Sequence, residues 1–381
     1  MVELDDPAQL APVVADMSWL ESLAGTVLID EWQRHPPVWD FVRRAADAGT
    51  GPGRYLLTGS AAPSSAAVHS GAGRIVRLRM RPMSLAERGL VAPTVSLGAL
   101  LTGDRPRVGG ESPLGLPDYV EEVLASGFPG IRTLAGRPRR LQLNGYLDRV
   151  VDRDFPELGF LVRRPATLRA WLAAYAAATS TTTSYNTLLR AATAGYGEKP
   201  AKTTTIAYRD TLERLWLLDP VPGWVPGHGH LGRLGQAPKH HLADPALAAA
   251  LLGVDAGKLL TGAEAGPPVP RDGTLLGALF ESLVTLSVRV YAQPHEAQIS
   301  HLRLWDGRHE VDLVVERPDG AVVAVEVKLG SVIEDHDVRH LRWLAEKLGD
   351  RLLDAVVVST GPVAYRRPDG IAVVPAGLLT T

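Results

Sequence analysis

Two strand-like segments near the C-terminal end of the chain carry charged side chains at a spacing that could support chemistry. Asp312 lies in the string Glu-Val-Asp-Leu-Val-Val, and Glu326 and Lys328 lie in Val-Ala-Val-Glu-Val-Lys. Between them, Pro-Asp-Gly at 318–320 is typical of a three-residue hairpin loop closed by a left-handed glycine. This loop fixes the register of an antiparallel strand pair and places Asp312 directly opposite Glu326. Alternation along each strand then predicts that Asp312, Glu326 and Lys328 share one face of the sheet.

Two carboxylates about 5 Å apart across a strand pair repel one another and destabilise the sheet. A positive partner must therefore compensate Asp312 and Glu326. Lys328 is one candidate, and a divalent metal ion held by hard carboxylate oxygens is the other. Two interpretations stay open: a metal site, or a half-exposed sheet face on which Lys328 neutralises its acidic neighbours.

A second pair of apolar runs, near the N-terminal end, also finishes in polar groups. Residues 24–31 end in Asp30-Glu31, and residues 54–60 end in Thr-Gly-Ser. Residues 38–48 between them have apolar side chains at helical spacing. Strand, helix and strand in this order predict a βαβ unit with buried parallel strands. Apolar residues followed by Asp-Glu have the form of a Walker B motif, in which the Asp holds Mg²⁺ and the Glu polarises a water.

Three strings together resemble a prokaryotic group of AAA-like P-loop ATPases. They are Val-Leu-Ile-Asp-Glu-Trp-Gln-Arg-His-Pro at 27–36, Tyr-Leu-Leu-Thr-Gly-Ser-Ala at 55–61, and Gly-Arg-Ile-Val-Arg-Leu-Arg-Met-Arg-Pro-Met-Ser-Leu-Ala-Glu at 73–87. Proteins of this group carry a C-terminal domain of unknown function with a restriction-endonuclease-like, PD-(D/E)xK fold. The strings around Asp312 and Glu326 are similar to that domain, so the resemblance covers most of the chain.

For the N-terminal domain, the resemblance implies an ATP site with Mg²⁺. Asp30 would ligate the metal, Glu31 would be the catalytic base, and Ser60 would be the sensor of the γ-phosphate. Arg74 and Arg77 are candidates for stabilising charge on the phosphates.

For the C-terminal domain, the resemblance implies a nuclease-like site. Asp312 and Glu326 would bind Mg²⁺, which lowers the pKa of a bound water. Lys328 would orient the water or stabilise the charge of the phosphorane, and Glu281, on an upstream helix, would complete the set.

One part of the ATPase pattern is not found in the sequence. A P-loop needs Gly-x-x-x-x-Gly-Lys followed by Ser or Thr, because backbone amides and a lysine cradle the phosphates. The chain has six lysines, and none precedes Lys199. We therefore expect the sequence to begin after the phosphate-binding loop, through a late-assigned start or a genuine loss. ATP hydrolysis by this chain is then expected to be lost.

Composition limits the remaining possibilities. The chain has 381 residues, a formal net charge of −2 and no cysteine, which excludes disulfides, thiol nucleophiles and cysteine-held zinc. A near-neutral charge gives no global basic field, so nucleic acid could be bound only by a local patch. The sequence shows no signal peptide and no apolar run long enough to span a bilayer, so we expect a cytoplasmic protein without membrane partners.

These observations predict an α/β protein of several domains. Residues 1–110 would form an AAA-like ATPase domain lacking its P-loop, 111–160 a helical connector, 161–226 a winged-helix-like region, and 227–381 a nuclease-like domain. The winged-helix-like region is expected to have helices at 168–178, 185–192 and 203–215, followed by a short hairpin at 216–225. Asp-Pro at 244–245 predicts a helix start, with Asp as the cap and Pro at the first position. The expected function is that of a DNA-associated ATPase-nuclease relative that has lost ATP hydrolysis. The alternatives are a non-catalytic interaction or regulatory protein, whose acidic sites only stabilise its folds, and an active ATPase with a mis-assigned start.

Overall fold

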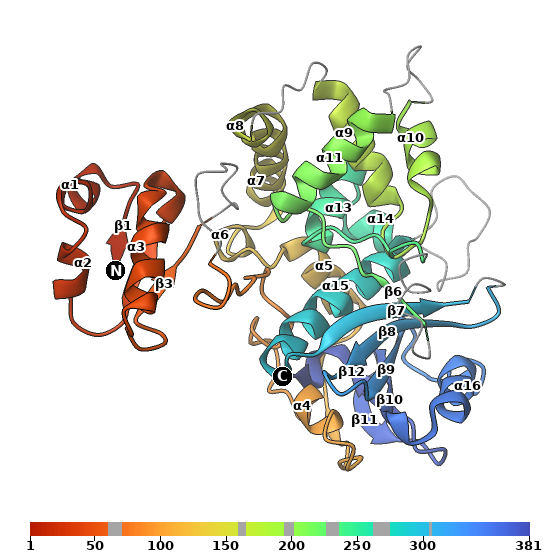
Figure 1. Ribbon diagram of the computed structural model, residues 1–381. Helices are drawn as coiled ribbons and strands as arrows, with labels where there is room; N and C mark the ends of the chain where they lie inside the picture. Colours follow the sequence, from red (N-terminus) through yellow and green to blue (C-terminus); the bar gives the residue numbers. More distant parts are fainter. Residues whose placement is uncertain (60–70, 159–164, 194–201, 226–235, 262–274, 305–306) are drawn as a thin grey trace. The chain divides into compact units, whose positions relative to one another are not determined.

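The computed structural model describes residues 1–59, 71–158, 165–193, 202–225, 236–261, 275–304 and 307–381 (Figure 1). The chain divides into two compact units. The first unit consists of Met1–Met80 together with Asp210–Trp216, and the second unit consists of Arg81–Arg209 together with Leu217–Thr381. Helices and strands are mixed along the chain, so the prediction of an α/β protein is confirmed.

The first unit is built on a parallel sheet of order β1-β2-β3. Its elements are β1 (Val2–Glu3), α1 (Pro7–Ala15), α2 (Trp19–Ser22), β2 (Val27–Asp30), η1 (Trp32–Arg34), α3 (Pro37–Asp47) and β3 (Tyr55–Leu57). Val38 and Phe41 on one face of α3 pack into the same core as Val27 and Ile29 of β2. The predicted strand, helix and strand are therefore confirmed.

Helices make up the first half of the second unit and return between its strands. They are α4 (Leu97–Leu100), α5 (Leu116–Ala125), α6 (Pro129–Arg132), α7 (Gly136–Arg149), the π-helix η2 (Val150–Asp154), α8 (Phe155–Glu157), α9 (Pro165–Ala177), α10 (Tyr185–Thr193), α11 (Lys202–Arg214), α13 (Pro245–Leu252), α14 (Ala256–Thr261), α15 (Leu275–Ala292), η4 (Gln293–His295), α16 (Arg339–Leu348), η5 (Gly349–Arg351) and η6 (Ala376–Leu378). The last turn of α11 belongs to the first unit.

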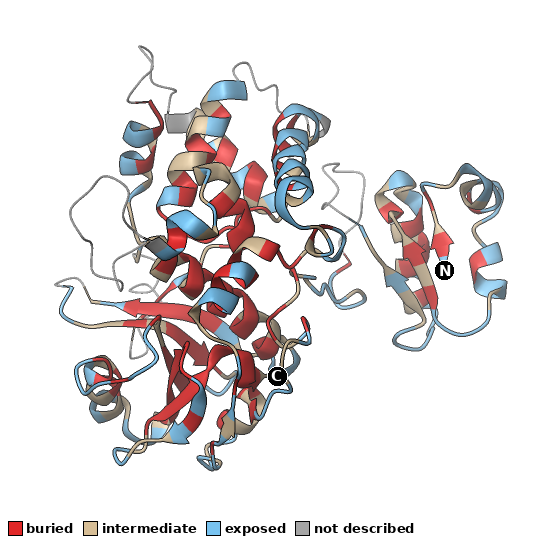
Figure 2. Ribbon diagram, turned by 180° about the vertical axis from the view of Figure 1, so that it is seen from behind, coloured by how far each residue is buried: buried red, intermediate tan, exposed pale blue. Residues whose placement is uncertain are grey.

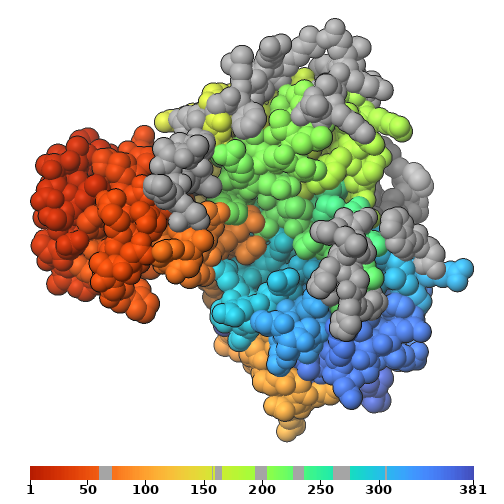
Figure 3. Space-filling model, viewed as in Figure 1, coloured from red at the N-terminus to blue at the C-terminus, as the bar shows by residue number. Residues whose placement is uncertain are grey.

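A large mixed sheet forms the base of the second unit, in the order β5-β11-β12-β10-β9-β8-β7-β6. Its strands are β5 (Gly110–Glu111), β6 (Gly223–Trp224), β7 (Gln298–Arg303), β8 (Glu310–Glu316), β9 (Val322–Lys328), β10 (Leu352–Ser359), β11 (Val363–Arg366) and β12 (Ala372–Pro375), while β4 (Val95–Ser96) pairs separately with β13 (Leu379–Thr380). Figure 3 shows the orange segment that contains β4 and β5 lying against the blue C-terminal part of the chain.

The β8–β9 hairpin has the predicted register. Leu313 pairs with Val325 and Glu316 with Val322, and Gly320 closes the loop with a φ of 84°. A left-handed residue at this place is what the Pro-Asp-Gly loop requires, since glycine adopts positive φ without steric cost. The structure therefore confirms the register that the Pro-Asp-Gly turn predicts.

Helix α15 runs through the core of the second unit. By length and composition alone the segment Leu275–His295 could cross a membrane, but 67% of its apolar window is buried inside the fold. Figure 2 shows the same pattern, with burial concentrated along the strands of the large sheet and the helices that pack on it. Such burial of the apolar window is typical of a core helix in a folded domain. The cytoplasmic location stays a prediction.

Residues 81–110 belong to the second compact unit and not to the unit of Met1–Met80 and Asp210–Trp216, and the expected domain bounds stay predictions. One predicted feature of the middle of the chain differs in the structure. The predicted helices of the winged-helix-like region are present as α9, α10 and α11, but the hairpin expected at 216–225 does not form. Instead Leu218 and Val221 bridge to Leu242 and Lys239, and β6 joins β7 of the large sheet.

Candidate functional site

Lys239 lies at the centre of a group of carboxylates in the second unit. Its ammonium nitrogen is 2.8 Å from Glu281 Oε1, 3.0 Å from Asp312 Oδ1 and 3.4 Å from Glu310 Oε1. The side chain of Lys239 is 1% exposed. Hydrogen bonds between ionised partners are short and strong, and a buried ammonium is tolerated only with such partners.

Three separate parts of the chain bring these groups together. The backbone of Lys239 exchanges two 2.9 Å hydrogen bonds with Val221, which fixes its segment as an extended run. Glu281 is carried by the core helix α15, and Glu310 and Asp312 stand at the first and third positions of β8. We call Lys239, Glu281, Glu310, Asp312, Glu326 and Lys328 the charged cluster.

A second lysine balances the remaining acid of the charged cluster. Lys328 Nζ lies 3.0 Å from Glu326 Oε1, as the predicted shared face requires. Asp312 Oδ2 accepts a 2.9 Å hydrogen bond from the backbone N–H of Val327 in β9. This contact lies just beyond Leu313 and Val325, the last backbone pair between β8 and β9 at this end. Both predicted carboxylates therefore have a positive partner in the protein, Lys239 for Asp312 and Lys328 for Glu326.

The pKa values of the charged cluster move in opposite directions. Burial alone would lower the pKa of Lys239, but the nearby Asp312, Glu281 and Glu310 outweigh it and hold that pKa well above its ordinary value. Burial and the charge of Asp312 raise the pKa of Glu281 to about 8 and that of Glu326 well above its usual range.

Asp312 behaves differently from these two acids. Burial would raise its pKa, but the ammonium of Lys239 and the N–H of Val327 overcome this and lower it. Environments that push neighbouring carboxyl groups apart in pKa are common at functional sites. The pKa of Asp312 is therefore lowered, while the pKa values of Glu281 and Glu326 are raised.

The donor set of the charged cluster does not fit a divalent metal as it stands. Both oxygens of Asp312 are engaged, one by Lys239 and one by Val327, and Lys239 Nζ fills the space between Asp312 and Glu281. The buried Oε2 of Glu326 has no hydrogen-bond partner among the described residues. No group of three or more His, Asp or Glu in the described part of the chain could hold a metal ion. Mg²⁺ binding here stays a prediction.

Cationic and aromatic side chains lie near Glu310 and Lys328 of the charged cluster. Arg303 approaches Glu310 at 3.7 Å, and His309 stacks on Trp343 of α16 with ring centroids 4.0 Å apart. Burial and the neighbouring charges of Arg339, His309 and Lys328 lower the pKa of His340. We call Arg303, His309, Arg339 and Trp343, together with Lys328 of the charged cluster, the cationic rim.

In the first unit, Asp30 and Glu31 stand at the end of β2 as predicted. Thr58, at the end of the neighbouring strand β3, donates its hydroxyl to Asp30 Oδ1. Glu31 has a φ of 51°, which is left-handed and costly for a residue other than glycine, and its carboxylate accepts the side-chain amide of Gln33. The structure thus brings the ends of β2 and β3 together, as a βαβ unit requires.

The other predicted phosphate contacts are placed differently. Arg74 donates to Asp47 of α3 at 2.7 Å, so its charge is already engaged on that helix. Arg77 is exposed, and Ser60 lies outside the described residues. The roles assigned to Arg74, Arg77 and Ser60 stay predictions.

Comparison with protein families gives three matches along the chain. Residues 1–88 match an AAA domain, residues 116–258 match a domain of unknown function (DUF8612), and residues 276–379 match a domain of unknown function (DUF4143). No curated protein and no solved structure matches the chain. Residues 1–88 are therefore similar to an AAA domain, which agrees with the parallel sheet and the Asp30-Glu31 pair. The C-terminal part of the chain carries a domain whose family has no assigned function.

Sequence reasoning missed Lys239, the most buried member of the charged cluster. Lys239 is 42 residues from Glu281 and 73 from Asp312, so no local pattern connects them. The signal that could have found Lys239 is the need of Asp312 and Glu326 for a positive partner, because the chain has six lysines from which to choose.

Proposed function

We propose that this chain is a nucleic-acid-associated protein of the AAA-like class whose C-terminal domain binds its partner without cutting it. The observation that carries the proposal is the position of Lys239, whose ammonium stands among the carboxylates where a nuclease would hold a metal. This favours the non-catalytic alternative over the nuclease.

Charge balance supports this interpretation. Lys239 and Lys328 supply two positive charges, while the pKa of Glu281, raised to about 8, reduces the negative charge of the charged cluster near neutral pH. A dication would have to displace Lys239 from a site in which it is 1% exposed. Removing one partner of a buried charge pair is strongly unfavourable, so the cluster favours its own ammonium.

The partner class follows from the cationic rim. Arg303 has 45% and Lys328 has 22% of the side chain exposed, and Arg339 is also exposed. Arginine and lysine neutralise phosphates, and aromatic faces accept unstacked bases. Together with the stacked His309 and Trp343, these residues suit a single-stranded nucleic acid better than a protein surface.

A cleavage assay tests the non-catalytic part of the proposal. Single- and double-stranded DNA and RNA are incubated with the chain and Mg²⁺ or Mn²⁺, beside Glu326→Ala and Lys328→Ala. We expect the wild type to release no more product than either variant. Metal-dependent cleavage by the wild type that both substitutions abolish would overturn the proposal and restore the nuclease.

Fluorescence anisotropy with a labelled single-stranded oligonucleotide tests the binding part. We expect Arg303→Ala and Arg339→Ala each to weaken binding and to reduce the slope of log K against log salt by about 0.7, the value for one lost phosphate contact on a single strand. Arg342→Ala, which removes an exposed arginine paired with Asp369, is the matched control. Equal slopes in all four proteins would contradict the proposal.

For the N-terminal domain, we propose that the 381-residue chain does not hydrolyse ATP. The support is the sequence itself, since none of the first 198 residues is a lysine that could hold the β- and γ-phosphates. Phosphate release from ATP by the purified chain should equal that of Glu31→Gln. Release by the wild type that Glu31→Gln removes would favour the active ATPase.

A further inference from the structure

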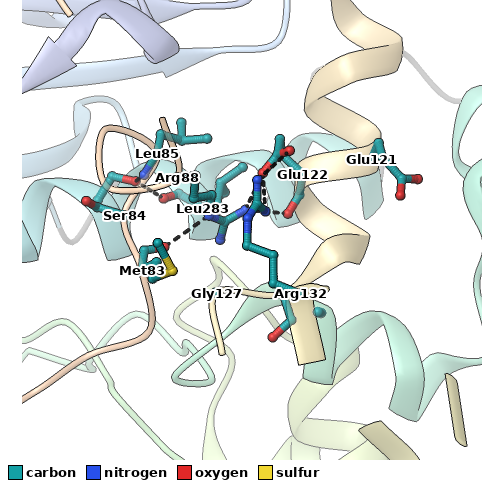
Figure 4. Close-up of polar contacts among 12 residues, drawn as sticks. Met83, Ser84, Leu85, Arg88, Glu121, Glu122, Gly127, Arg132 and Leu283 are labelled. Atoms are coloured by element: carbon teal, nitrogen blue, oxygen red, sulfur yellow. Dashed lines mark hydrogen bonds and ion pairs between the residues drawn. The ribbon is translucent and has the colours of Figure 1, made fainter. Parts of the chain in front are cut away.

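Two arginine networks of the second unit respond differently to pH. Arg88 and Arg132 both donate to the carboxylate of Glu122 (Figure 4). Burial would raise the pKa of Glu122, but the two arginines outweigh it and lower that pKa, so this network keeps its charges through neutral pH. Arg339 meets a different acceptor, because its Nε donates to His340 Nε2 at 3.0 Å. An imidazole nitrogen stops accepting once it binds a proton.

Arg339, His340 and His309 form a chain of hydrogen bonds. His340 lies on α16, and its Nδ1 is 3.5 Å from Nδ1 of His309. Because Nε2 of neutral His340 accepts from Arg339, the proton of that ring is on Nδ1, which donates to His309. Both acceptors of the chain are therefore unprotonated imidazole nitrogens, and the chain is complete only while both rings are neutral.

The ring of His309 covers Trp343. The two ring centroids lie 4.0 Å apart, with an angle of 10° between the planes. The backbone carbonyl of His309 accepts the N–H of Leu304 at 3.0 Å, and Trp343 packs against the hydrophobic core of the large sheet. The backbone and the indole are therefore held in place, whereas the imidazole, attached by two rotatable bonds, can turn away and expose the indole.

The surroundings of His340 oppose its protonation. Burial has the largest effect, and the charges of Arg339, His309 and Lys328 add to it and lower the pKa of His340, while Glu310 acts against them. These groups lie on α16, on β8 and β9, and directly before β8. His340 therefore takes up its proton at a pH below its ordinary pKa of 6.5. Its charge then faces the guanidinium of Arg339, and both hydrogen bonds of the chain are lost.

We propose that Arg339, His340 and His309 form a proton-sensitive latch, which keeps His309 on Trp343 and releases it when the imidazoles are protonated. A base of a single-stranded nucleic acid then takes the place of His309, because aromatic faces accept unstacked bases of any sequence. The latch rests on the proposed nucleic-acid binding and adds its regulation by pH. Protonated imidazoles also attract phosphates, so the test must separate an uncovered indole from added charge.

Fluorescence anisotropy with a labelled oligothymidylate, at about pH 8 and about pH 5.5, tests the latch on either side of the ordinary imidazole pKa. We expect the wild-type chain to bind about fivefold more tightly at the lower pH, the least that one stacked base supplies. His309→Ala leaves the indole uncovered, so it should bind at the higher pH as tightly as the wild type does at the lower pH. Trp343→Leu should bind weakly at both.

The matched control is His336→Ala, which removes a histidine that is 65% exposed and lies beside Glu334. It should keep the full pH response of the wild type. If His309→Ala loses the response without binding more tightly at the higher pH, His309 is a phosphate contact and the latch is overturned. Equal responses in the wild type and His309→Ala overturn it as well. Circular dichroism checks folding, and His309→Ser replaces His309→Ala if that variant does not fold.

Nuclear magnetic resonance of the free chain, labelled with ¹⁵N in the histidine rings, separates the latch from nucleic-acid binding. At about pH 8, we expect the proton of His340 on Nδ1, with His340→Gln identifying its signals. A proton on Nε2 overturns the latch, because Nε2 could then not accept from Arg339. If no protein binds the oligonucleotide at either pH, the nucleic-acid proposal fails, and the position of this proton alone decides whether the hydrogen-bonded chain exists.

Discussion

The ammonium of Lys239 lies 3.0 Å from Asp312 Oδ1, although the two residues are 73 positions apart in the chain. The same nitrogen reaches Glu281 of α15 at 2.8 Å. A buried ammonium therefore connects the extended segment after residue 236, the core helix and the sheet. Lys239 therefore ties these three elements together within the charged cluster.

Replacing Lys239 should destabilise the second unit severely. Lys239→Met leaves Asp312 and Glu281 without their buried partner, and breaking such a pair costs about 3–5 kcal/mol. Urea unfolding followed by circular dichroism measures the loss. Lys347→Met, at an exposed position, should change the free energy of unfolding by no more than about 0.5 kcal/mol. If both substitutions lowered the free energy of unfolding by similar amounts, the ion pairs of Lys239 would not stabilise the fold.

The charged cluster should make stability fall as the pH rises. Burial raises the pKa of Glu281 to about 8 from an ordinary 4.5, so the folded chain keeps a proton that the unfolded chain releases. This contribution is fully present below pH 4.5 and is lost as the pH rises to about 8. Glu281→Gln removes it, so its free energy of unfolding should fall less steeply across this range. Parallel curves for the two proteins would contradict the assignment.

Divalent cations should not stabilise the wild-type chain. A site filled at about 100 times its Kd would add about 2.7 kcal/mol, which a thermal scan with Mn²⁺ against a chelator detects easily. We expect no shift for the wild type, because Lys239 already occupies the space among the carboxylates. Lys239→Ala, which vacates that space, should gain a Mn²⁺-dependent increase in Tm. A shift in the wild type as large as that in the variant would mean that the lysine does not exclude the metal.

In the first unit, the hydroxyl of Thr58 should stabilise the end of β2 through Asp30. Thr58→Val keeps the shape of the side chain and removes the donor, at a cost of about 1 kcal/mol. Hydrogen exchange should speed up at the amides of β2 and β3 and stay unchanged in β9. Thr133→Val, at an exposed threonine of the second unit, should leave the amides of β2 and β3 unaffected. Faster exchange in both variants would argue against a specific contact.

Local signals in the sequence were enough to predict several elements of the fold. The Pro-Asp-Gly loop gave the register of β8 and β9, and Asp244 caps α13 through its 2.8 Å bond from Ala246 N–H, as the Asp-Pro pair indicated. These features depend on a few consecutive residues. The same holds for β2, α3 and β3, whose apolar spacing is regular.

Long-range relationships were not accessible from the sequence. Lys239 contacts Asp312 because the segment around residue 239 pairs with Val221, which precedes β6 of the large sheet. No residue close to Lys239 in the sequence predicts this pairing. The expected hairpin at 216–225 was wrong for the same reason, since its residues found partners in other segments. The ion pair of Arg74 with Asp47 of α3 was not indicated by the sequence either, and the role of Arg74 at the phosphates stays a prediction.

The central claim is that a lysine, and not a metal ion, neutralises Asp312. Crystals grown with excess Mn²⁺ and measured at its absorption edge test this most directly. The account predicts Lys239 Nζ about 3 Å from Asp312 and Glu281, with no anomalous peak among the carboxylates. An anomalous peak ligated by Asp312 and Glu326, with Lys239 turned away, would contradict it.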